Sequence, residues 1–385
     1  MAQFGLCYSP NLGDGVIAEC LGHGLRARRP GVEVTHVDIA GRQDFGHVTI
    51  RGRRLMLAAL HLLPQALRQP LAERKLNRIV DGVAPEWRAA ARADLAVIGG
   101  GQVLSDANLN FPVKIGRAAR MIAEAGTPVA IHAAGVSRNW TPRGRDLFQA
   151  LAACDLRLVG TRDAASAEAW SAQFEGGPAP EIVLDPGLLA ADCYGPVAAE
   201  VGLVGLCVTD FALLGHHADG VVAGGQDGVR FYERVARALI ASGRKVRLFT
   251  NGAAEDRAAR VRVVSALGDV ADRLDLPPDA ERPAELVAQV AGCEVVVAHR
   301  LHACIVAYSY GRGIVGLGWD RKLQSFFETV GREDAFVAEA DSPANIATLV
   351  QAARPADDDP RHAEVIAGAW AGIDRLLACV RDAEG

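Results

Sequence analysis

Short apolar runs alternate along most of the chain with segments that are apolar at helical spacing. Each run is followed by glycine or polar residues, which is typical of buried strands in a sheet that is covered on both faces. In the first half the runs occupy residues 4–8, 32–39, 95–98, 128–132, 156–160 and 182–184, and in the second half residues 203–208, 245–250, 294–298 and 313–317. Because helical patterns separate most of these runs, we expect parallel sheets.

The alternation stops over residues 187–202, which are rich in small residues, and then starts again. Two successive strand–helix repeats predict an α/β fold with two Rossmann-like domains facing across a cleft. We expect an N-terminal domain over residues 1–190 and a C-terminal domain over residues 200–340. Residues 341–385 should add C-terminal helices, for which the N-terminal domain is a candidate packing partner.

Composition narrows the class of protein. The chain has 385 residues, of which 50% are hydrophobic and 23% charged, as in soluble globular proteins. The net charge of −5 gives no basic field for nucleic acid. No apolar run is long enough for a membrane span, and no secretory signal is evident at the N-terminus. Eight scattered cysteines without a CxxC pair indicate buried thiols, so we expect a cytoplasmic protein.

One stretch, residues 51–80, is both basic and apolar, and we expect Pro64 and Pro70 to interrupt it. It could be a helical excursion that covers the N-terminal sheet. It could instead be a membrane-surface element that brings the protein to the inner face of the membrane and reaches a lipid-linked molecule. The pattern leaves both interpretations open.

Candidate chemistry begins directly after the first strand, at Asn11-Leu12-Gly13-Asp14. Glycine allows a tight turn there, and the following helix N-terminus offers free N–H groups to an anion. Asp14 could take a proton from a hydroxyl group. The alternative interpretation is that Asp14 caps the helix.

Three further strand ends carry candidate binding residues. Gly99, Gly100 and Gly101 follow one strand and would let a ligand approach the backbone, although the spacing is neither GxGxxG nor a Walker loop. Ser137 lies beyond the end of the next strand. Arg162 follows the strand after that, where a guanidinium could bind a carboxylate or a phosphate.

The densest group is Ala298-His299-Arg300-Leu301-His302-Ala303, between a strand and a helix. Arg300 and His302 should face the same side, because alternate residues of an extended chain do so. The arginine could bind an anion, and the histidine could transfer a proton near neutral pH. The ligand spacing of a metal site is missing here and at His216-His217, so we expect no metal. Lys322, one of four lysines, opens the helix after the next strand.

In this order, several segments resemble the polysaccharide pyruvyl transferase family, over about residues 5–335. The most specific is the block over residues 298–331, with Arg-Leu-His-Ala followed by a small-residue helix, a strand and Asp-x-Lys. The other matching segments are NLGD (11–14), DLAVIGGGQVLSD (94–106), HAAGVS (132–137), TRDAAS (161–166) and DPGLL (185–189). His299 departs from the family, which more often has a small polar residue there.

The resemblance implies a glycosyltransferase-B-like fold and an enzyme that moves the enolpyruvyl unit of phosphoenolpyruvate onto a sugar, forming a pyruvate ketal. The acceptor would be a cell-surface or exopolysaccharide glycan, or its lipid-linked precursor, and no cofactor would be needed. The N-terminal domain would be the acceptor side and the C-terminal domain the donor side.

The family's motif residues map onto Asn11, Gly13, Asp14, Arg162, Arg300, Leu301 and His302. Arg162 and Arg300 would bind the two anionic groups of the donor. His302 is the candidate general acid and Asp14 the candidate base toward the acceptor. Gly100, Gly101, Ser137 and Lys322 are candidate contacts to substrate.

Two other functions stay open. One is a glycosyltransferase of the same architecture that uses a sugar nucleotide, in which Asp320 or Glu328 would bind the ribose. The other is a scaffold without catalytic activity that has kept the fold.

Overall fold

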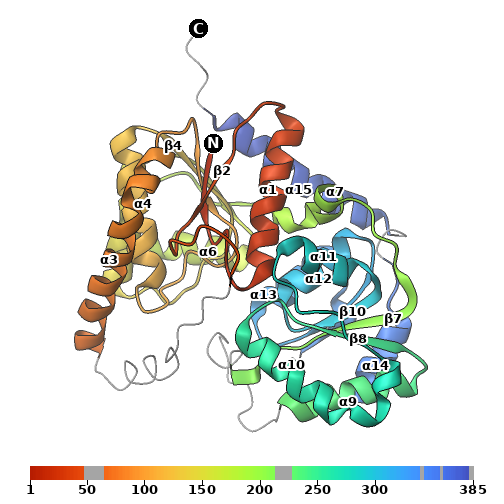
Figure 1. The fold of residues 1–385 in the computed structure, drawn as a ribbon. Coiled ribbons are helices and arrows are strands. Elements are labelled where there is room, and N and C mark those ends of the chain that lie inside the picture. Colours follow the sequence, from red (N-terminus) through yellow and green to blue (C-terminus); the bar gives the residue numbers. More distant parts are fainter. Residues whose placement is uncertain (47–64, 213–227, 339–341, 356–358, 381–385) are drawn as a thin grey trace. The chain divides into compact units, whose positions relative to one another are not determined.

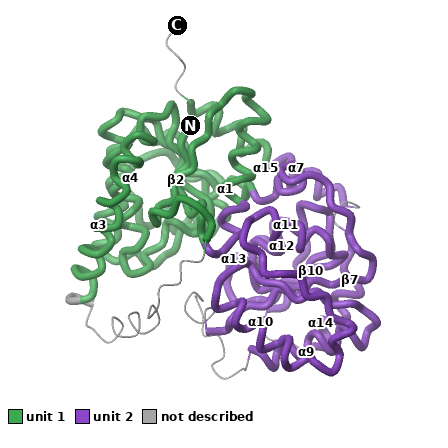
Figure 2. The backbone as a smooth tube through the Cα atoms, in the orientation of Figure 1, with its two compact units in different colours: residues 1–9, 17–186, 369–385 green, residues 10–16, 187–368 purple. Residues whose placement is uncertain are grey.

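The computed structural model describes residues 1–46, 65–212, 228–338, 342–355 and 359–380. The chain forms two units, shown in Figure 2. Unit 1 contains residues 1–9, 17–186 and 369–385, and unit 2 contains residues 10–16 and 187–368. The first turn of the N-terminal helix is therefore grouped with unit 2. His216 and His217, and the part of the basic stretch before residue 65, lie outside the described residues.

Unit 1 is built on a six-stranded parallel sheet in the order β2-β1-β3-β4-β5-β6. Its strands are β1 (Ala2–Gly5), β2 (Thr35–Asp38), β3 (Ala96–Gly99), β4 (Pro128–Ala134), β5 (Asp155–Thr161) and β6 (Glu181–Ile182). The main helices are α1 (Leu12–Arg28), α3 (Gln65–Ala90), α4 (Asn110–Ala125), α5 (Pro142–Phe148) and α6 (Ala164–Gln173). In Figure 1, α3 and α4 lie on one side of this sheet and α1 on the other.

Unit 2 repeats the plan with the sheet order β12-β11-β10-β7-β8-β9, in which every pair is parallel. The strands are β7 (Glu200–Cys207), β8 (Lys245–Phe249), β9 (Leu274–Asp275), β10 (Cys293–Ala298), β11 (Gly313–Leu317) and β12 (Phe336–Val337). The helices are α7 (Ala190–Tyr194), α9 (Gly228–Ala241), α10 (Ala254–Ala266), α11 (Pro283–Ala291), α12 (Leu301–Ser309), α13 (Arg321–Val330), α14 (Pro343–Ala352) and α15 (Pro360–Ala378), the last ending in unit 1.

Both sheets are buried on two faces, as their apolar strands require. In unit 2, Val204 and Leu206 of β7 pack against a helical layer that includes Tyr232 of α9, Val263 of α10 and Ile346 of α14. Figure 1 shows α11 and α12 on the opposite face of this sheet. The predicted α/β fold of two Rossmann-like domains is confirmed. The edge strands β9 and β12, with two residues each, are additional to the predicted strands because so short a pairing leaves no sequence pattern.

Helix α3 corrects one expectation, because it continues through Pro70 and also through Pro85. Proline removes one helical hydrogen bond, but packing can outweigh that loss. Val80, Ala84 and Trp87 lie on one face of α3 and are buried in the core of unit 1. Trp87 meets Phe4 of β1 edge to face, with ring centroids 6.2 Å apart. The second half of α3 therefore covers the N-terminal sheet, whereas Leu76 of the basic stretch packs against Leu109, Val113 and Leu147. Within the described residues, no helix is long and apolar enough to cross a membrane.

Candidate active site

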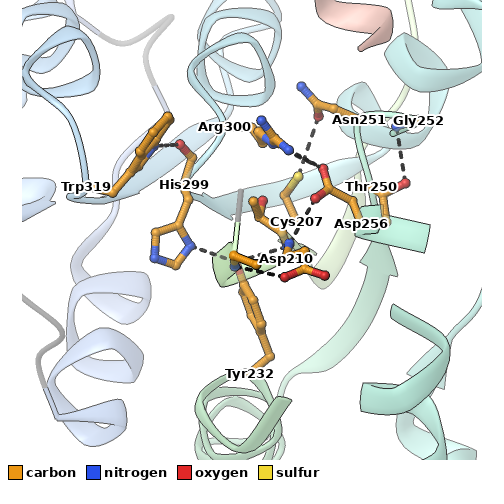
Figure 3. Close-up of polar contacts among 12 residues, drawn as sticks. Cys207, Asp210, Tyr232, Thr250, Asn251, Gly252, Asp256, His299, Arg300 and Trp319 are labelled. Atoms are coloured by element: carbon orange, nitrogen blue, oxygen red, sulfur yellow. Dashed lines mark hydrogen bonds and ion pairs between the residues drawn. The ribbon is translucent and has the colours of Figure 1, made fainter. Parts of the chain in front are cut away.

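The carboxyl ends of three neighbouring strands in unit 2 carry a dense group of polar side chains (Figure 3). The strands β10, β7 and β8 are adjacent in the sheet. Arg300 follows β10, Asp210 follows β7 and Asn251 follows β8. Ligands of open parallel sheets bind at this edge. The group is therefore the candidate active site of unit 2.

Arg300 forms an ion pair with the buried Asp256, which lies in the first turn of α10. Nη2 of Arg300 lies 2.5 Å from Oδ2 of Asp256, and Nε donates to the same oxygen at 3.2 Å. The other oxygen, Oδ1, accepts a hydrogen bond from the backbone N–H of Asp210 at 2.9 Å. Burial raises the pKa of Asp256, and the Arg300 guanidinium opposes that shift. Asp256 thus holds Arg300 in one orientation.

His302 lies inside helix α12, not in extended chain. The helix starts at Leu301, directly after Arg300 as its N-cap residue, so the expectation that alternation of an extended chain aligns Arg300 with His302 is wrong. His302 is 8% exposed. A Cβ atom on Gly13 would lie 2.5 Å from Cβ of His302 and 2.6 Å from its Nδ1. The first turn of α1 and the start of α12 are therefore in direct contact.

The segment Asn11–Asp14 is tied to β8 as well. The backbone N–H of Leu12 donates to the carbonyl of Asn251 at 2.8 Å. Gly252 has a φ of +98°, and a Cβ there would lie 2.7 Å from the carbonyl oxygen of Pro10. Only glycine fits both the positive φ and this close approach of the backbone. Helix α1 begins at Leu12, which places Asp14 in its first turn and rules out Asp14 as the N-cap residue.

His299, the departure from the family pattern, is a packing residue. Its ring lies against Phe211, Phe231 and Tyr232, with centroids 5.5 to 5.7 Å apart. The Tyr232 hydroxyl accepts from the backbone N–H of Thr209 and lies 2.7 Å from Nδ1 of His299. Burial, followed by the charge of Arg300, lowers the pKa of His299 to about 3. The ring is therefore neutral, and its Nδ1 shares a hydrogen bond with the Tyr232 hydroxyl.

Lys322 lies in the first turn of α13, with Nζ 3.3 Å from Oδ2 of Asp320. Asp320 caps the same helix by accepting from the backbone N–H of Leu323 at 3.1 Å. The preceding Trp319 donates its indole N–H to the carbonyl of His299. These contacts connect the start of α13 with the end of β10.

Arg162 belongs to unit 1, where it follows β5. Its side chain is 8% exposed and pairs with Asp163 at 3.3 Å. A Cβ on Gly135 would lie 2.6 Å from Nη2 of Arg162, so the guanidinium packs directly on that glycine. Ser137, two residues later, donates to the side-chain oxygen of Asn139. Arg162 thus lies against the end of β4, and Ser137 follows that contact by two residues.

Gly100 and Gly101 also lie in unit 1, at the end of β3, with φ angles of +79° and +74°. A Cβ on Gly100 would lie 3.0 Å from the Ile17 side chain of α1. The carbonyl of Gly101 accepts from the N–H of Gly135 at 2.9 Å. This glycine turn packs a helix and a strand closely together.

Strand β4 carries a strained position beside these residues. Ala133 has a φ of +48°, and the register with β5 shifts between Ile131 and Ala134. Such irregularities at strand ends redirect side chains and cluster at functional sites. The preceding His132 is 1% exposed, and its burial lowers its pKa to about 4. Gly135, and Arg162 that packs on it, each follow directly after the last residue pair of β4 and β5, Ala134 with Thr161.

The structure thus divides the predicted site residues into two groups. Unit 2 brings together the segment Asn11–Asp14 with Arg300, Leu301 and His302, and Lys322 lies on the next strand connection. Unit 1 holds Gly100, Gly101, Ser137 and Arg162. Among the described residues, no group of three or more histidine, cysteine or carboxylate side chains could hold a metal ion.

Sequence reasoning missed Asp256 and Asn251, which contribute directly to the unit 2 group. Asn251 carried a usable signal, because it follows an apolar strand in the way that Arg300 does. Asp256 carried a weaker one, since an acidic residue in the first turn of a helix is ordinary. Only the strand order, with β7 between β8 and β10, brings Asp256 to Arg300.

Solved structures with a similar fold define the class. The chain is similar to a Listeria monocytogenes protein assigned as a UDP-N-acetylglucosamine 2-epimerase, with 12% identity, a TM-score of 0.57, and 99% of this chain and 94% of that chain covered. It is also similar to S. aureus MnaA in complex with UDP, with 10% identity, a TM-score of 0.53 and coverage of 98% and 94%. A third is the Neisseria meningitidis UDP-GlcNAc 2-epimerase bound to UDP-GlcNAc, with 10% identity, a TM-score of 0.51 and 98% of both chains covered. The fold is glycosyltransferase-B-like.

Sequence comparison then gives the family. The model of the family described as polysaccharide pyruvyl transferase matches residues 11–321. The chain belongs to this family, which is a family of transferases acting on polysaccharides. No curated protein matches the sequence.

Proposed function

We propose that the protein transfers the enolpyruvyl unit of phosphoenolpyruvate to a sugar of a cell-surface or exopolysaccharide glycan, or of its lipid-linked precursor, and forms a pyruvate ketal. The family supports a transferase with a polysaccharide acceptor. One observation carries the donor assignment: the first turn of α1, with Asp14, packs on the start of α12, with His302 beside Arg300. A carboxylate, a histidine and a guanidinium are thereby gathered in unit 2.

The chemistry requires a proton on the methylene carbon of phosphoenolpyruvate, which leaves an oxocarbenium-like centre on the neighbouring carbon. His302 is the proposed general acid for this step. A sugar hydroxyl attacks that centre and loses its proton to Asp14. A second hydroxyl then displaces phosphate and gives its proton to the leaving phosphate, and the two new C–O bonds complete the ketal.

The donor carries a carboxylate and a phosphate, and guanidinium groups bind both in a forked geometry. Arg300 is already oriented by Asp256, so little ordering entropy remains to be lost when the anion binds. Arg162, in unit 1, stays a prediction as a second donor-binding residue. Gly100, Gly101, Ser137 and Lys322 stay predictions as substrate contacts, and the reaction needs no cofactor.

The acceptor side of the proposal includes a place in the cell. We propose that the protein works in the cytoplasm, at the inner face of the membrane, where lipid-linked sugars are reached. Helix α3 exposes Leu71, Arg74, Lys75, Arg78 and Ile79, a basic and apolar set suited to anionic lipid. Flotation with anionic vesicles at low salt should carry the wild type upward and leave an Arg74→Glu/Arg78→Glu variant behind. A wild type that stays at the bottom would remove the membrane contact.

A sugar-nucleotide glycosyltransferase is the second candidate, favoured by the solved structures bound to UDP and UDP-GlcNAc. In that case Asp320 or Glu328 would bind ribose. Asp320 already caps α13 and pairs with Lys322, and Glu328 accepts from Gln324 on an exposed surface. Thermal shifts with phosphoenolpyruvate, UDP-sugars and GDP-sugars separate the two candidates.

The deciding experiment combines phosphate release with mass spectrometry of the glycan from cells with and without the protein. Each ketal should add about 70 daltons, the mass of pyruvic acid less one water. Phosphate release that needs both phosphoenolpyruvate and glycan would support the proposal. Donor binding without turnover on any glycan would favour a non-catalytic scaffold instead.

A further inference from the structure

We propose that Asn251 is a substrate-binding residue, and that its side-chain amide donates hydrogen bonds to the oxyanion group that Arg300 binds. This oxyanion group is a carboxylate or a phosphate, both of which present oxygen atoms that accept hydrogen bonds. The inference rests on the proposed function only for the identity of the anion as part of phosphoenolpyruvate.

Asn251 and Arg300 lie around a common neighbour at the carboxyl edge of the unit 2 sheet (Figure 3). Cys207 ends β7, the strand between β8 and β10. Its thiol lies 3.5 Å from Oδ1 of Asn251. In the sheet Cys207 is paired with Phe249, two residues before Asn251, and with Ala298, two residues before Arg300. The amide and the guanidinium therefore belong to one small region.

The Asn251 side chain is held in place before any ligand arrives. Burial raises the pKa of Cys207 well above its ordinary value, so the group stays a thiol and donates to Oδ1 of Asn251. The backbone is fixed by the bond from Leu12 to the Asn251 carbonyl and by the bond from the Gly252 N–H to Oγ1 of Thr250, at 3.2 Å. Figure 3 shows the amide nitrogen directed away from Cys207.

That nitrogen has no hydrogen-bond partner among the described residues, although Asn251 is only 1% exposed. A buried donor without a partner is costly to the free protein. Rotating the amide by half a turn does not help, because it would lose the thiol bond and leave the oxygen unpaired in the same place. Oγ1 of Thr209, at the end of β7, is likewise buried and has no partner in the described part of the chain.

A ligand oxygen would satisfy the amide. The –NH2 group offers two donors and no acceptor, so it suits an oxyanion and not a cation. The ion pair with Asp256 engages Nε and Nη2 of Arg300, and Nη1 is outside that pair. A neutral amide beside the guanidinium adds a directed hydrogen bond without adding charge, which is the composition of a small-anion site.

The test is calorimetric titration of the wild type, Asn251→Ala and Asn251→Asp with phosphoenolpyruvate, pyruvate, inorganic phosphate and UDP. Asn251→Ala should weaken phosphoenolpyruvate binding about tenfold, the loss expected for one hydrogen bond to a charged group. Asn251→Asp should weaken it further by repulsion, while keeping the shape and the bond from Cys207. Pyruvate and phosphate show which end of the donor the amide contacts. Asn77→Ala, which removes an acceptor of Arg117 in unit 1, is the matched control.

The melting temperature of ligand-free Asn251→Ala adds an independent readout. If the amide serves to bind the ligand, the melting temperature of Asn251→Ala should equal or exceed that of the wild type. If the amide is structural, the melting temperature should be lower. Unchanged phosphoenolpyruvate affinity in both variants would overturn the inference and leave the proposed function standing. Wild-type binding of UDP but not of phosphoenolpyruvate, lost in Asn251→Ala, would keep the subsite and refute the proposed donor. Binding of none of the four compounds would overturn the subsite.

Discussion

Gly13 and His302 are in contact so close that no side chain fits between them: a Cβ on Gly13 would lie 2.5 Å from Cβ of His302. Both atoms are close to backbone, so neither can move cheaply. The contact fixes the separation between the first turn of α1 and the start of α12.

We therefore expect Gly13→Ala to cost about 1–3 kcal/mol of the free energy of unfolding, as other overpacked sites do. Turnover should fall at least about tenfold, because misplacement of a catalytic group by a fraction of an ångström is expensive. Urea denaturation and phosphate release measure the two effects. Gly82→Ala, in α3 with nothing within 4 Å of its added methyl, is the control and should keep full activity.

Gly135→Ala should behave differently, because the atoms nearest to its methyl all belong to the guanidinium of Arg162, with Nη2 at 2.6 Å. The guanidinium can turn aside at small cost in stability. We expect a melting temperature close to the wild type and a KM for phosphoenolpyruvate raised by about tenfold, the value of one charge-assisted hydrogen bond. An unchanged KM would count against Arg162 as a donor-binding residue.

Asp256→Asn should destabilise unit 2 by about 3 kcal/mol, the lower end for a broken buried pair, because it leaves the partly buried Arg300 without its counter-charge. Adding Arg300→Met to this variant should recover much of that loss, since no buried charge then remains. Neither variant should bind the donor. Asp81→Asn breaks an exposed pair with Arg117 and should cost less than about 1 kcal/mol. Additive effects in the double variant would show that the pair does not interact.

Acid should destabilise the protein through His299. Its pKa is about 3 in the folded chain against the ordinary 6.5, so the unfolded chain takes up a proton that the folded chain refuses. The stability is complete above about pH 6.5 and is lost as the pH falls toward 3, at about 1.4 kcal/mol per pH unit. His299→Phe should flatten the pH dependence of urea denaturation by that slope.

Tyr232→Phe is the matched control for that experiment, because it removes the same hydrogen bond and keeps the titrating ring. It should lower stability by about 1 kcal/mol and leave the slope near the wild-type value. If His299→Phe and the wild type show the same pH dependence of the free energy of unfolding, the proton taken up on unfolding binds to another group. The buried His132 in unit 1 is the next candidate.

Regular helices and strands were predictable because the local pattern of apolar and polar residues determines them. The strand Gly313–Leu317 occupies the predicted residues, and β8 and β10 each differ from the predicted run by one residue. β4 extends two residues beyond its predicted end through the bulge at Ala133, and alanine gives no sign of a positive φ. Pro70 was expected to interrupt the helix because the effect of a proline is local. The burial of Val80, Ala84 and Trp87, which outweighs that effect, depends on contacts far away in the sequence.

The candidate site was predictable where a single residue follows a strand, as with Arg162 and Arg300. The partners of these residues were not. Asp256 meets Arg300 and Asn251 meets Cys207 only because β7 lies between β8 and β10, an order that no local pattern encodes. The contact of Gly13 with His302 is long-range in the same sense.

The split of the chain between the two units has a consequence for synthesis on the ribosome. Unit 1 takes in residues from 369 onward, where Gly372 lies against Val183 and His132, and Arg157 donates to the carbonyl of Cys379 at 3.0 Å. The sheet of unit 1 is translated early, yet its last covering helix emerges only after all of unit 2. During that interval Val183 and the buried His132 lack the cover of Gly372, and surface of this kind on a nascent chain is what chaperones protect.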